Sequence, residues 1–175
     1  RENLSIDVEV TSLATGDLDA NGKVDLAYGG AEDGVFIRFR EKDDSWSIPV
    51  EIDAGVLRSG SGALAIRDLD GDGSPELLAH VKKGLEVFRI KGRESDGQPT
   101  LYRDDSPRSR GLHFADLDGD GDDDWLYQAP GDDRGVRTRL WDKSGFGPEY
   151  SHSLSSRSGV NLLPEGLSGK GKPAF

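Results

Sequence analysis

The chain has 175 residues, with 33 Asp and Glu against 22 Lys and Arg, and a formal net charge of −11 at pH 7. This acidity opposes binding to nucleic-acid phosphates, and we find no basic stripe that would counter it. The absence of cysteine excludes disulfides, zinc thiolates and thiol nucleophiles. No apolar run reaches the ~18 residues needed for a membrane-spanning helix. A 34% hydrophobic share with 24 glycines favours short strands and tight turns in one domain-sized chain.

The acidity is concentrated in a decapeptide that occurs three times. Its copies are "DLDANGKVDL" from Asp17, "DLDGDGSPEL" from Asp68 and "DLDGDGDDDW" from Asp116. Together they contain 13 of the 33 carboxylates. Because neighbouring carboxylates repel one another, this pattern indicates loops that require a counter-ion.

The decapeptide belongs to a longer repeat of about 50 residues, because its copies start at residues 17, 68 and 116. Two further markers keep the same register: Pro49, Pro99 and Pro148, and the glycines that open an apolar run, Gly34, Gly84 and Gly135. Three markers in one register make a chance similarity an unsatisfactory explanation.

Each repeat reads as four short strands. The first ends at the acidic loop ("GALAIR" from Gly62), and the second leaves it ("DLAYGG", "ELLAHV" and "DWLYQA"). The third follows the marker glycine and alternates, with Val35, Ile37 and Phe39 on one face. The fourth lies around the proline, where an edge position tolerates the missing N–H. No helical periodicity is evident.

Four-stranded units at this period predict an all-β fold, a β-propeller of four-stranded antiparallel blades. About three to three and a half blades fit, so we expect a partial or fragment propeller. Blades are assigned to residues 1–160, and residues 161–175 to a degenerate blade start or tail. "IDVEV" near the N-terminus reads as the end of an earlier blade. The next acidic loop is due near Glu165, which is the only acidic residue there.

The loop reads D-x-[DN]-x-[DN]-G-x-x-[DE], a pattern suited to a cation. Oxygens at positions 1, 3 and 5, a backbone carbonyl at position 7 and a carboxylate at position 9 can converge on one ion. Gly22, Gly73 and Gly121 at position 6 permit the sharp turn. Hard oxygen ligands fit Ca²⁺ best, with Mg²⁺ or Mn²⁺ as alternatives. An EF-hand is excluded because position 12 is Tyr or Ala instead of Glu.

The alternative is that these Asp-Gly runs are only solvated turns. All three loops have an acidic residue at position 9, a glycine at position 6 and a leucine at position 2. These leucines are Leu18, Leu69 and Leu117. This recurrence argues against simple solvated turns.

The loops and the blade period together resemble FG-GAP/VCBS repeats, the Ca²⁺-binding blades of integrin-α-type propellers. The resemblance covers about residues 1–160 and implies up to three Ca²⁺ ions. The implied ligands of the first site are Asp17, Asp19, Asn21, the Lys23 carbonyl and Asp25. Those of the second are Asp68, Asp70, Asp72, the Ser74 carbonyl and Glu76. Those of the third are Asp116, Asp118, Asp120, the Asp122 carbonyl and Asp124. Asn21 and Lys23 predict the lowest affinity for the first site, and Glu76 stands where the family usually has Asp.

Signals for catalysis are weak. His80, His113 and His152 are isolated, and His80 and His113 lie on expected strands, where a structural role is the commoner one. "GLSGKGKP" from Gly166 matches a phosphate-binding loop except that Pro173 replaces the Ser or Thr that holds Mg²⁺. Aromatic residues could stack on sugars, but inter-blade packing is the simpler role for them. These are Trp46, Trp125, Trp141, Tyr28 and Tyr127.

The sequence therefore predicts a non-catalytic, calcium-binding propeller module for extracellular protein or glycan binding or adhesion. Extracellular, cell-surface or periplasmic space is the expected location, because weak calcium sites fill there. One alternative is the propeller part of a larger polysaccharide lyase or hydrolase, and another is a purely structural spacer. Open blade faces predict self-association or contact with further blades of a longer parent chain.

Overall fold

The computed structural model describes residues 4–30, 34–58, 62–93, 100–104, 110–128, 135–142 and 144–153. All regular structure within these ranges is β, which confirms the predicted fold class. Consequently the described part of the chain contains no helix able to cross a membrane. The degenerate loop expected near Glu165, and the whole of residues 161–175, lie outside the described residues.

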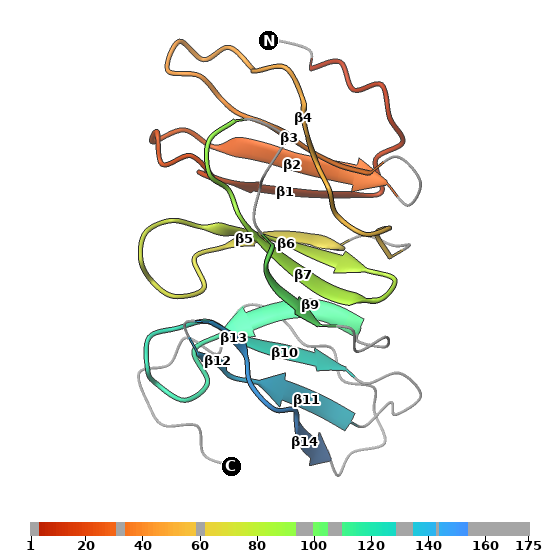
Figure 1. The fold of residues 1–175 in the computed structure, drawn as a ribbon, viewed down its shortest axis with the longest axis vertical. Helices are drawn as coiled ribbons and strands as arrows, with labels where there is room; N and C mark the ends of the chain where they lie inside the picture. Colours follow the sequence, from red (N-terminus) through yellow and green to blue (C-terminus); the bar gives the residue numbers. More distant parts are fainter. Residues whose placement is uncertain are drawn as a thin grey trace.

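Three four-stranded antiparallel sheets follow one another along the chain. The first sheet consists of β1 (Ser12–Gly16), β2 (Asp25–Gly30), β3 (Gly34–Arg38) and β4 (Val50–Ile52). The second consists of β5 (Leu64–Arg67), β6 (Glu76–Val81), β7 (Gly84–Arg89) and β8 (Thr100–Asp104). The third consists of β9 (Arg110–Ala115), β10 (Asp124–Gln128), β11 (Gly135–Arg139) and β14 (Tyr150–Ser153). In each sheet the strands pair in chain order, and the sheets stack with the first and third at opposite ends (Figure 1).

The strands form where the repeat predicts them. On and just after β3, Val35, Ile37 and Phe39 are buried, whereas the residues between them are partly exposed. β4 begins directly after Pro49, so this proline donates no ladder hydrogen bond and stands outside the strand. The segment "IDVEV" contains no strand. Just before it, the Ser5 carbonyl accepts a hydrogen bond from Arg38 of the first sheet.

The core is divided between the two interfaces of the stack. Ile37, Leu77 and Phe88 belong to the cluster between the first and second sheets. Leu78 and Trp125 belong to the cluster between the second and third sheets. Successive side chains of β6 point to opposite faces, so Leu77 and Leu78 contribute to different clusters. This explains why every residue of β6 is buried.

An additional hairpin, β12 (Trp141–Asp142) and β13 (Gly145–Phe146), interrupts the third sheet between β11 and β14. It inserts aromatic side chains into the second cluster: the Trp141 and Phe146 rings are 4.8 Å apart, and Tyr102 of β8 lies 5.4 Å from Phe146. Trp125, Tyr127 and Trp141 are at most 2% exposed, which confirms inter-blade packing for them. Trp46 stays partly exposed, with the Arg40 guanidinium 4.8 Å from its ring centroid.

The inter-sheet packing can be tested with two leucines. Leu77 is completely buried between sheets, whereas Leu13 on β1 is 61% exposed. We expect Leu77→Ala to lower the free energy of unfolding by about 2–5 kcal/mol, because it removes packed methyl groups and leaves a cavity. Leu13→Ala should change it by less than about 0.5 kcal/mol when both variants are measured at a protein concentration low enough to keep the chain monomeric. Chemical denaturation of both variants measures the difference, and similar losses would contradict this packing.

Candidate metal centres

The three acidic loops share four hydrogen bonds from backbone N–H groups to side chains. The side chain at position 1 accepts from the N–H of position 6, and the side chain at position 3 accepts from the N–H of position 5. The side chain at position 5 accepts from the N–H of position 7, and the carboxylate at position 9 accepts from the N–H of position 2. In the third loop the acceptors are Asp116 (3.3 Å), Asp118 (3.1 Å), Asp120 (2.9 Å) and Asp124 (2.7 Å). The sequence repeat is therefore also a repeat of geometry.

The glycine at position 6 has the predicted conformation in every loop. Its φ angle is 83° at Gly22, 86° at Gly73 and 101° at Gly121. A side chain at these angles would strain the backbone, whereas glycine adopts them without cost. The turn aims the N–H of this glycine at the position 1 carboxylate and brings the acidic side chains round to one side.

Carboxylates at positions 1, 3 and 9 come together in each loop, with one oxygen of each within 4.8 Å of the others. The groups are Asp17, Asp19 and Asp25; Asp68, Asp70 and Glu76; and Asp116, Asp118 and Asp124. Asp72 and Asp120 at position 5 are outside these groups, and their Oδ1 atoms accept from the N–H of position 7. The Asn21 carbonyl oxygen does the same in the first loop. The carbonyl ligands at Lys23, Ser74 and Asp122 stay predictions.

The position 9 carboxylates are fully buried: Asp25, Glu76 and Asp124 are each 0% exposed. Asp25 accepts 2.8 Å hydrogen bonds from the Leu18 N–H and the Arg40 N–H, so it joins the loop to the segment just after β3. Asp124 is bound in the same way, by the N–H groups of Leu117 and Trp141.

Burial raises the pKa of Asp25, Glu76 and Asp124, and neighbouring loop carboxylates raise it further. Backbone hydrogen bonds oppose this rise, and at Glu76 so does an arginine. A carboxylate in such surroundings is stabilised in its charged form by a nearby cation. The acidic clusters are therefore compatible with metal binding.

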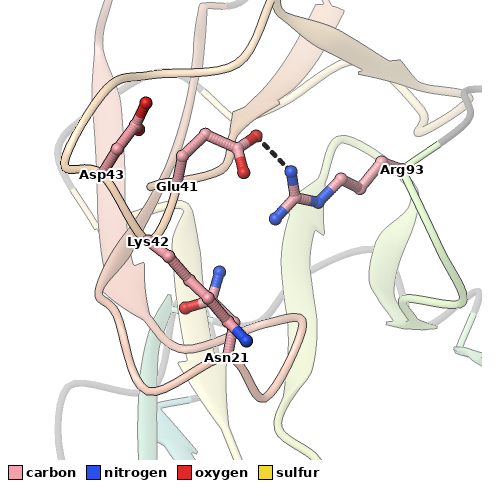
Figure 2. A pocket seen from close by; sticks show the side chains of 5 residues that line it. All are labelled: Asn21, Glu41, Lys42, Asp43 and Arg93. Carbon is pink, nitrogen blue, oxygen red and sulfur yellow. Dashed lines mark hydrogen bonds and ion pairs between the residues drawn. The ribbon is translucent and has the colours of Figure 1, made fainter.

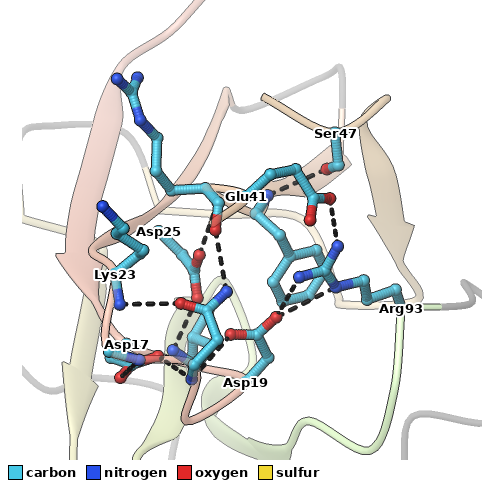
Figure 3. A network of polar contacts seen from close by, with 12 residues as sticks. Asp17, Asp19, Lys23, Asp25, Glu41, Ser47 and Arg93 are labelled. Atoms are coloured by element: carbon cyan, nitrogen blue, oxygen red, sulfur yellow. Dashed lines mark hydrogen bonds and ion pairs between the residues drawn. The ribbon is translucent and has the colours of Figure 1, made fainter. Parts of the chain in front are cut away.

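In the first loop, an arginine from the segment that follows β7 contacts one candidate ligand. Arg93 donates to Asp19 Oδ2 at 3.0 and 2.5 Å and also bonds Glu41, and its guanidinium lies 5.2 Å from the Phe39 ring centroid. Figure 3 shows Arg93 between Glu41 and Asp19. Lys23, which predicted a weak site, pairs instead with Asp44 at 2.8 Å.

A polar hollow of about 460 Å³ opens beside this loop, between loops of the first blade and the segment after β7 (Figure 2). It is lined by Asn21, Glu41, Lys42, Asp43 and Arg93. All five side chains are polar or charged, and Asn21 also belongs to the first candidate site. The hollow therefore exposes the first loop to solvent, and its lining contains both acidic and basic side chains.

In the second loop an arginine lies among the candidate ligands themselves. Arg89 Nη2 is 2.6 Å from Glu76 Oε1, 2.9 Å from Asp70 Oδ2 and 3.7 Å from Asp72 Oδ2. The longer side chain of Glu76, compared with Asp25 and Asp124, reaches this guanidinium. Asp68 Oδ1 is buried in the same loop without a hydrogen-bond partner in the structure. An orphaned carboxylate oxygen of this kind is suited to a cation.

The third loop has a different set of partners. Asp116, Asp118 and Asp124 accept hydrogen bonds from backbone N–H groups. Within the described ranges, no arginine or lysine forms an ion pair with these three carboxylates.

Sequence reasoning did not identify Arg89 and Arg93 as neighbours of the loops. Arg89 carried a usable signal, because it pairs directly across the strands with Glu76. Arg93 carried none, because it lies 74 residues from Asp19 in the chain.

The loops lie along the same side of the stack (Figure 1). The Asp123 N–H donates to the Leu69 carbonyl at 2.9 Å and so joins the third loop to the second. Burial raises the pKa of Asp123, Arg67 opposes this rise, and the charges of Asp116 and Asp68, one from each loop, add to it.

The histidines show structural surroundings. His80 is 4% exposed, and burial, aided by Arg58, lowers its pKa to about 4. Burial also lowers the pKa of His113. His80 is therefore neutral at physiological pH, and its burial on β6 agrees with the structural role that the sequence favours.

Comparison with known families identifies the repeat. The FG-GAP-like repeat model matches residues 17–79 and again residues 68–127, so that the two matches include all three loops. The chain belongs to the FG-GAP-like repeat family. FG-GAP-like repeats form β-propeller blades, so the three sheets are blades of a partial, unclosed propeller. Neither the curated proteins nor the solved structures gave a significant match.

The position 9 residue of an FG-GAP-like blade should matter even without metal. We expect Asp124→Asn, measured in EDTA, to lower the free energy of unfolding by about 1–3 kcal/mol. Two backbone N–H groups now donate to the Asp124 carboxylate. In Asp124→Asn the amide NH₂ group would face one of these donors, and that hydrogen bond would be lost.

Asp120→Asn is the matched control, because Asp120 is exposed and an amide oxygen can still accept from Asp122, as Asn21 does from Lys23. It should leave the free energy of unfolding in EDTA unchanged or slightly higher, since it removes a repelling charge. Equal losses for the two variants would show that burial of Asp124 has no special role.

Proposed function

We propose that the chain is a non-catalytic β-propeller module whose loops bind Ca²⁺, with up to three ions per chain. The observation that supports this most is the threefold recurrence of one carboxylate cluster at positions 1, 3 and 9. Every side-chain ligand is an oxygen, and a flexible loop of carboxylate and carbonyl oxygens suits Ca²⁺, which takes about six to eight oxygen ligands, better than Zn²⁺ or Cu²⁺.

Each ion would stabilise the hairpin formed by the first and second strands of its blade. In the third blade, Asp116 and Asp118 precede the turn, and Asp124 is the first residue of β10. A cation held by all three would join both ends of the loop and offset their repulsion. The protein's own part is to hold these oxygens in place through the shared backbone hydrogen bonds.

Calcium should therefore stabilise the fold. At a Ca²⁺ concentration 100 times the dissociation constant, one site adds about 2.7 kcal/mol to the free energy of unfolding. We expect Asp116→Ala and Asp68→Ala to lower the melting temperature in Ca²⁺ by several degrees, because the remaining carboxylates lose their shared ion. Differential scanning calorimetry in Ca²⁺ and in EDTA measures this difference.

Asp53→Ala is the control for charge alone, because Asp53 is an exposed aspartate outside the loops. Its melting temperature should keep the wild-type response to Ca²⁺. If the wild-type protein melts at the same temperature in Ca²⁺ and in EDTA, the proposal that these loops bind calcium is wrong. Isothermal titration calorimetry then gives the number of ions bound.

A calcium-stabilised propeller suits an extracellular, cell-surface or periplasmic setting, where millimolar Ca²⁺ fills weak sites. In that setting we propose that the module binds a protein or glycan ligand in adhesion. The alternatives are a propeller attached to a polysaccharide lyase or hydrolase, and a structural spacer. Binding to a glycan array, or a pull-down of surface proteins, separates the binding module from the spacer. An assay for polysaccharide cleavage tests the enzyme alternative.

The outer face of the first sheet supports an additional contact. On β1, the Ser12 hydroxyl accepts from the Leu64 N–H, and Ala14 packs on the cluster between the first two sheets. Leu13 therefore points away from the second sheet, and it is 61% exposed. A blade packs on both faces in a propeller, so we propose that this face contacts a further blade or a second copy of the chain.

The chain alone should then self-associate, and Leu13→Asp should restore a monomer because it places a charge in the contact. Sedimentation velocity over a range of protein concentrations measures both. Leu13→Ala serves as the milder comparison, with intermediate association. A wild-type protein that stays monomeric at every concentration would contradict this contact.

A further inference from the structure

We propose that Arg89 competes with the metal ion for the second loop and gives this loop a lower calcium affinity than the third. The inference rests on the proposed calcium binding and assigns a role to a residue outside the nine-residue loop. Arg89 is the last residue of β7, where the register places it directly opposite Glu76.

The guanidinium lies where its charge acts on the candidate ligands. Arg89 Nη2 is within hydrogen-bond distance of Glu76 and Asp70, and Nε also bonds Glu76 Oε1 at 2.9 Å. These hydrogen bonds to Glu76 and Asp70 raise the pKa of Arg89, so it stays charged. A calcium ion bound at about 2.3–2.6 Å from the same oxygens would have to displace these contacts.

The other two blades have no cation at the corresponding place. Extending the strand register by one residue places Phe39 opposite Asp25 and Leu140 opposite Asp124. There the second oxygen of the carboxylate accepts from a backbone N–H, of Arg40 or of Trp141. In the second blade the side chain of Arg89 takes the place of that backbone donor, and Glu76 replaces Asp. The arginine at position 89 and the glutamate at position 76 both depart from the repeat, and they interact directly with each other.

Arg93 in the first blade does not have the same effect. It contacts Asp19 alone among the candidate ligands there, and its second acidic partner, Glu41, is outside the loop. Arg89 instead contacts two ligands and lies 3.7 Å from a third. Arg89 does not satisfy every carboxylate oxygen of the second loop, because Asp68 Oδ1 remains buried without a hydrogen-bond partner. A metal ion can satisfy this oxygen and Arg89 cannot, so the loop keeps the ability to bind calcium at higher concentration.

The loop glycines allow each site to be followed separately. The N–H groups of Gly22, Gly73 and Gly121 each donate to the position 1 carboxylate of their own loop. Their amide resonances in two-dimensional NMR should therefore respond to Ca²⁺ at that loop. In wild-type protein we expect the Gly73 midpoint at a Ca²⁺ concentration about tenfold above that of Gly121, the ratio that ~1.4 kcal/mol of competition gives.

Arg89→Leu supplies the decisive variant, since Leu140 shows that a blade accepts leucine at this place. We expect the Gly73 midpoint to fall about tenfold and the Gly121 midpoint to stay unchanged. Arg67→Leu is the matched control. Arg67 lies on the other side of Glu76 in the register and is exposed, so its loss changes the net charge equally. It should leave the Gly73 midpoint within about twofold of wild type, because an exposed charge acts weakly.

The outcomes separate this inference from the proposed function. If Gly121 responds to Ca²⁺ but the Gly73 midpoint is the same in wild type and Arg89→Leu, competition by Arg89 is wrong and calcium binding stands. An equal shift in Arg67→Leu would also overturn it, in favour of a general charge effect. If no loop glycine responds in wild-type protein, the proposed function fails and this inference fails with it. Should Arg89→Leu not fold, a wild-type Gly73 midpoint well above that of Gly121 would support the inference, and a midpoint equal to or below that of Gly121 would contradict it.

Discussion

The buried carboxylate at the start of each second strand is the constraint on which the blades depend. Asp25, Glu76 and Asp124 are fully buried, and each accepts the N–H of the leucine at position 2. A charge in such a place is costly unless hydrogen bonds and opposite charge surround it. The acidic loop therefore has two tasks, to close a hairpin and to surround these carboxylates with hydrogen-bond donors that oppose the rise in their pKa. The blades meet the second task differently, with backbone donors in the first and third and with an arginine in the second.

The loops also take part in joining one blade to the next. Arg93, after β7, reaches Asp19 of the first loop, and the Asp123 N–H of the third loop donates to the Leu69 carbonyl of the second. The same candidate ligands, or their immediate neighbours, thus make contacts within a loop and between blades. Binding of an ion to one loop would alter the charge that an adjacent blade meets. In the first loop a candidate ligand side chain itself contacts the second blade, whereas the second and third loops are joined through backbone atoms.

Much of this architecture is predictable from the sequence because the repeat supplies independent markers. The acidic loops, the glycines at position 6 and the prolines before the fourth strands each fix one part of the blade. The alternation of Val35, Ile37 and Phe39 indicated which face of the first blade is buried. The β12–β13 hairpin was not predicted, although the first repeat has a related turn in which Arg40 is bridged to Trp46 and the Ser47 N–H donates to the Phe39 carbonyl.

The electrostatics of the candidate sites were less predictable. Counting carboxylates and lysines within the loop indicated a weak first site, yet Lys23 pairs with Asp44 and arginines from β7 and beyond it enter the first two loops. Which cation reaches a carboxylate depends on strand register and on the packing of adjacent sheets, which a local motif does not encode. For Arg89 the register alone would have been sufficient, whereas Arg93 required the packing.

The middle sheet belongs to both hydrophobic clusters, with Leu77 facing the first sheet and Leu78 facing the third. Opening either end sheet exposes one cluster, while opening the middle sheet exposes both. The stack should therefore fray from its ends and lose its centre last, so that backbone amides of β6 exchange with solvent only when the whole chain unfolds.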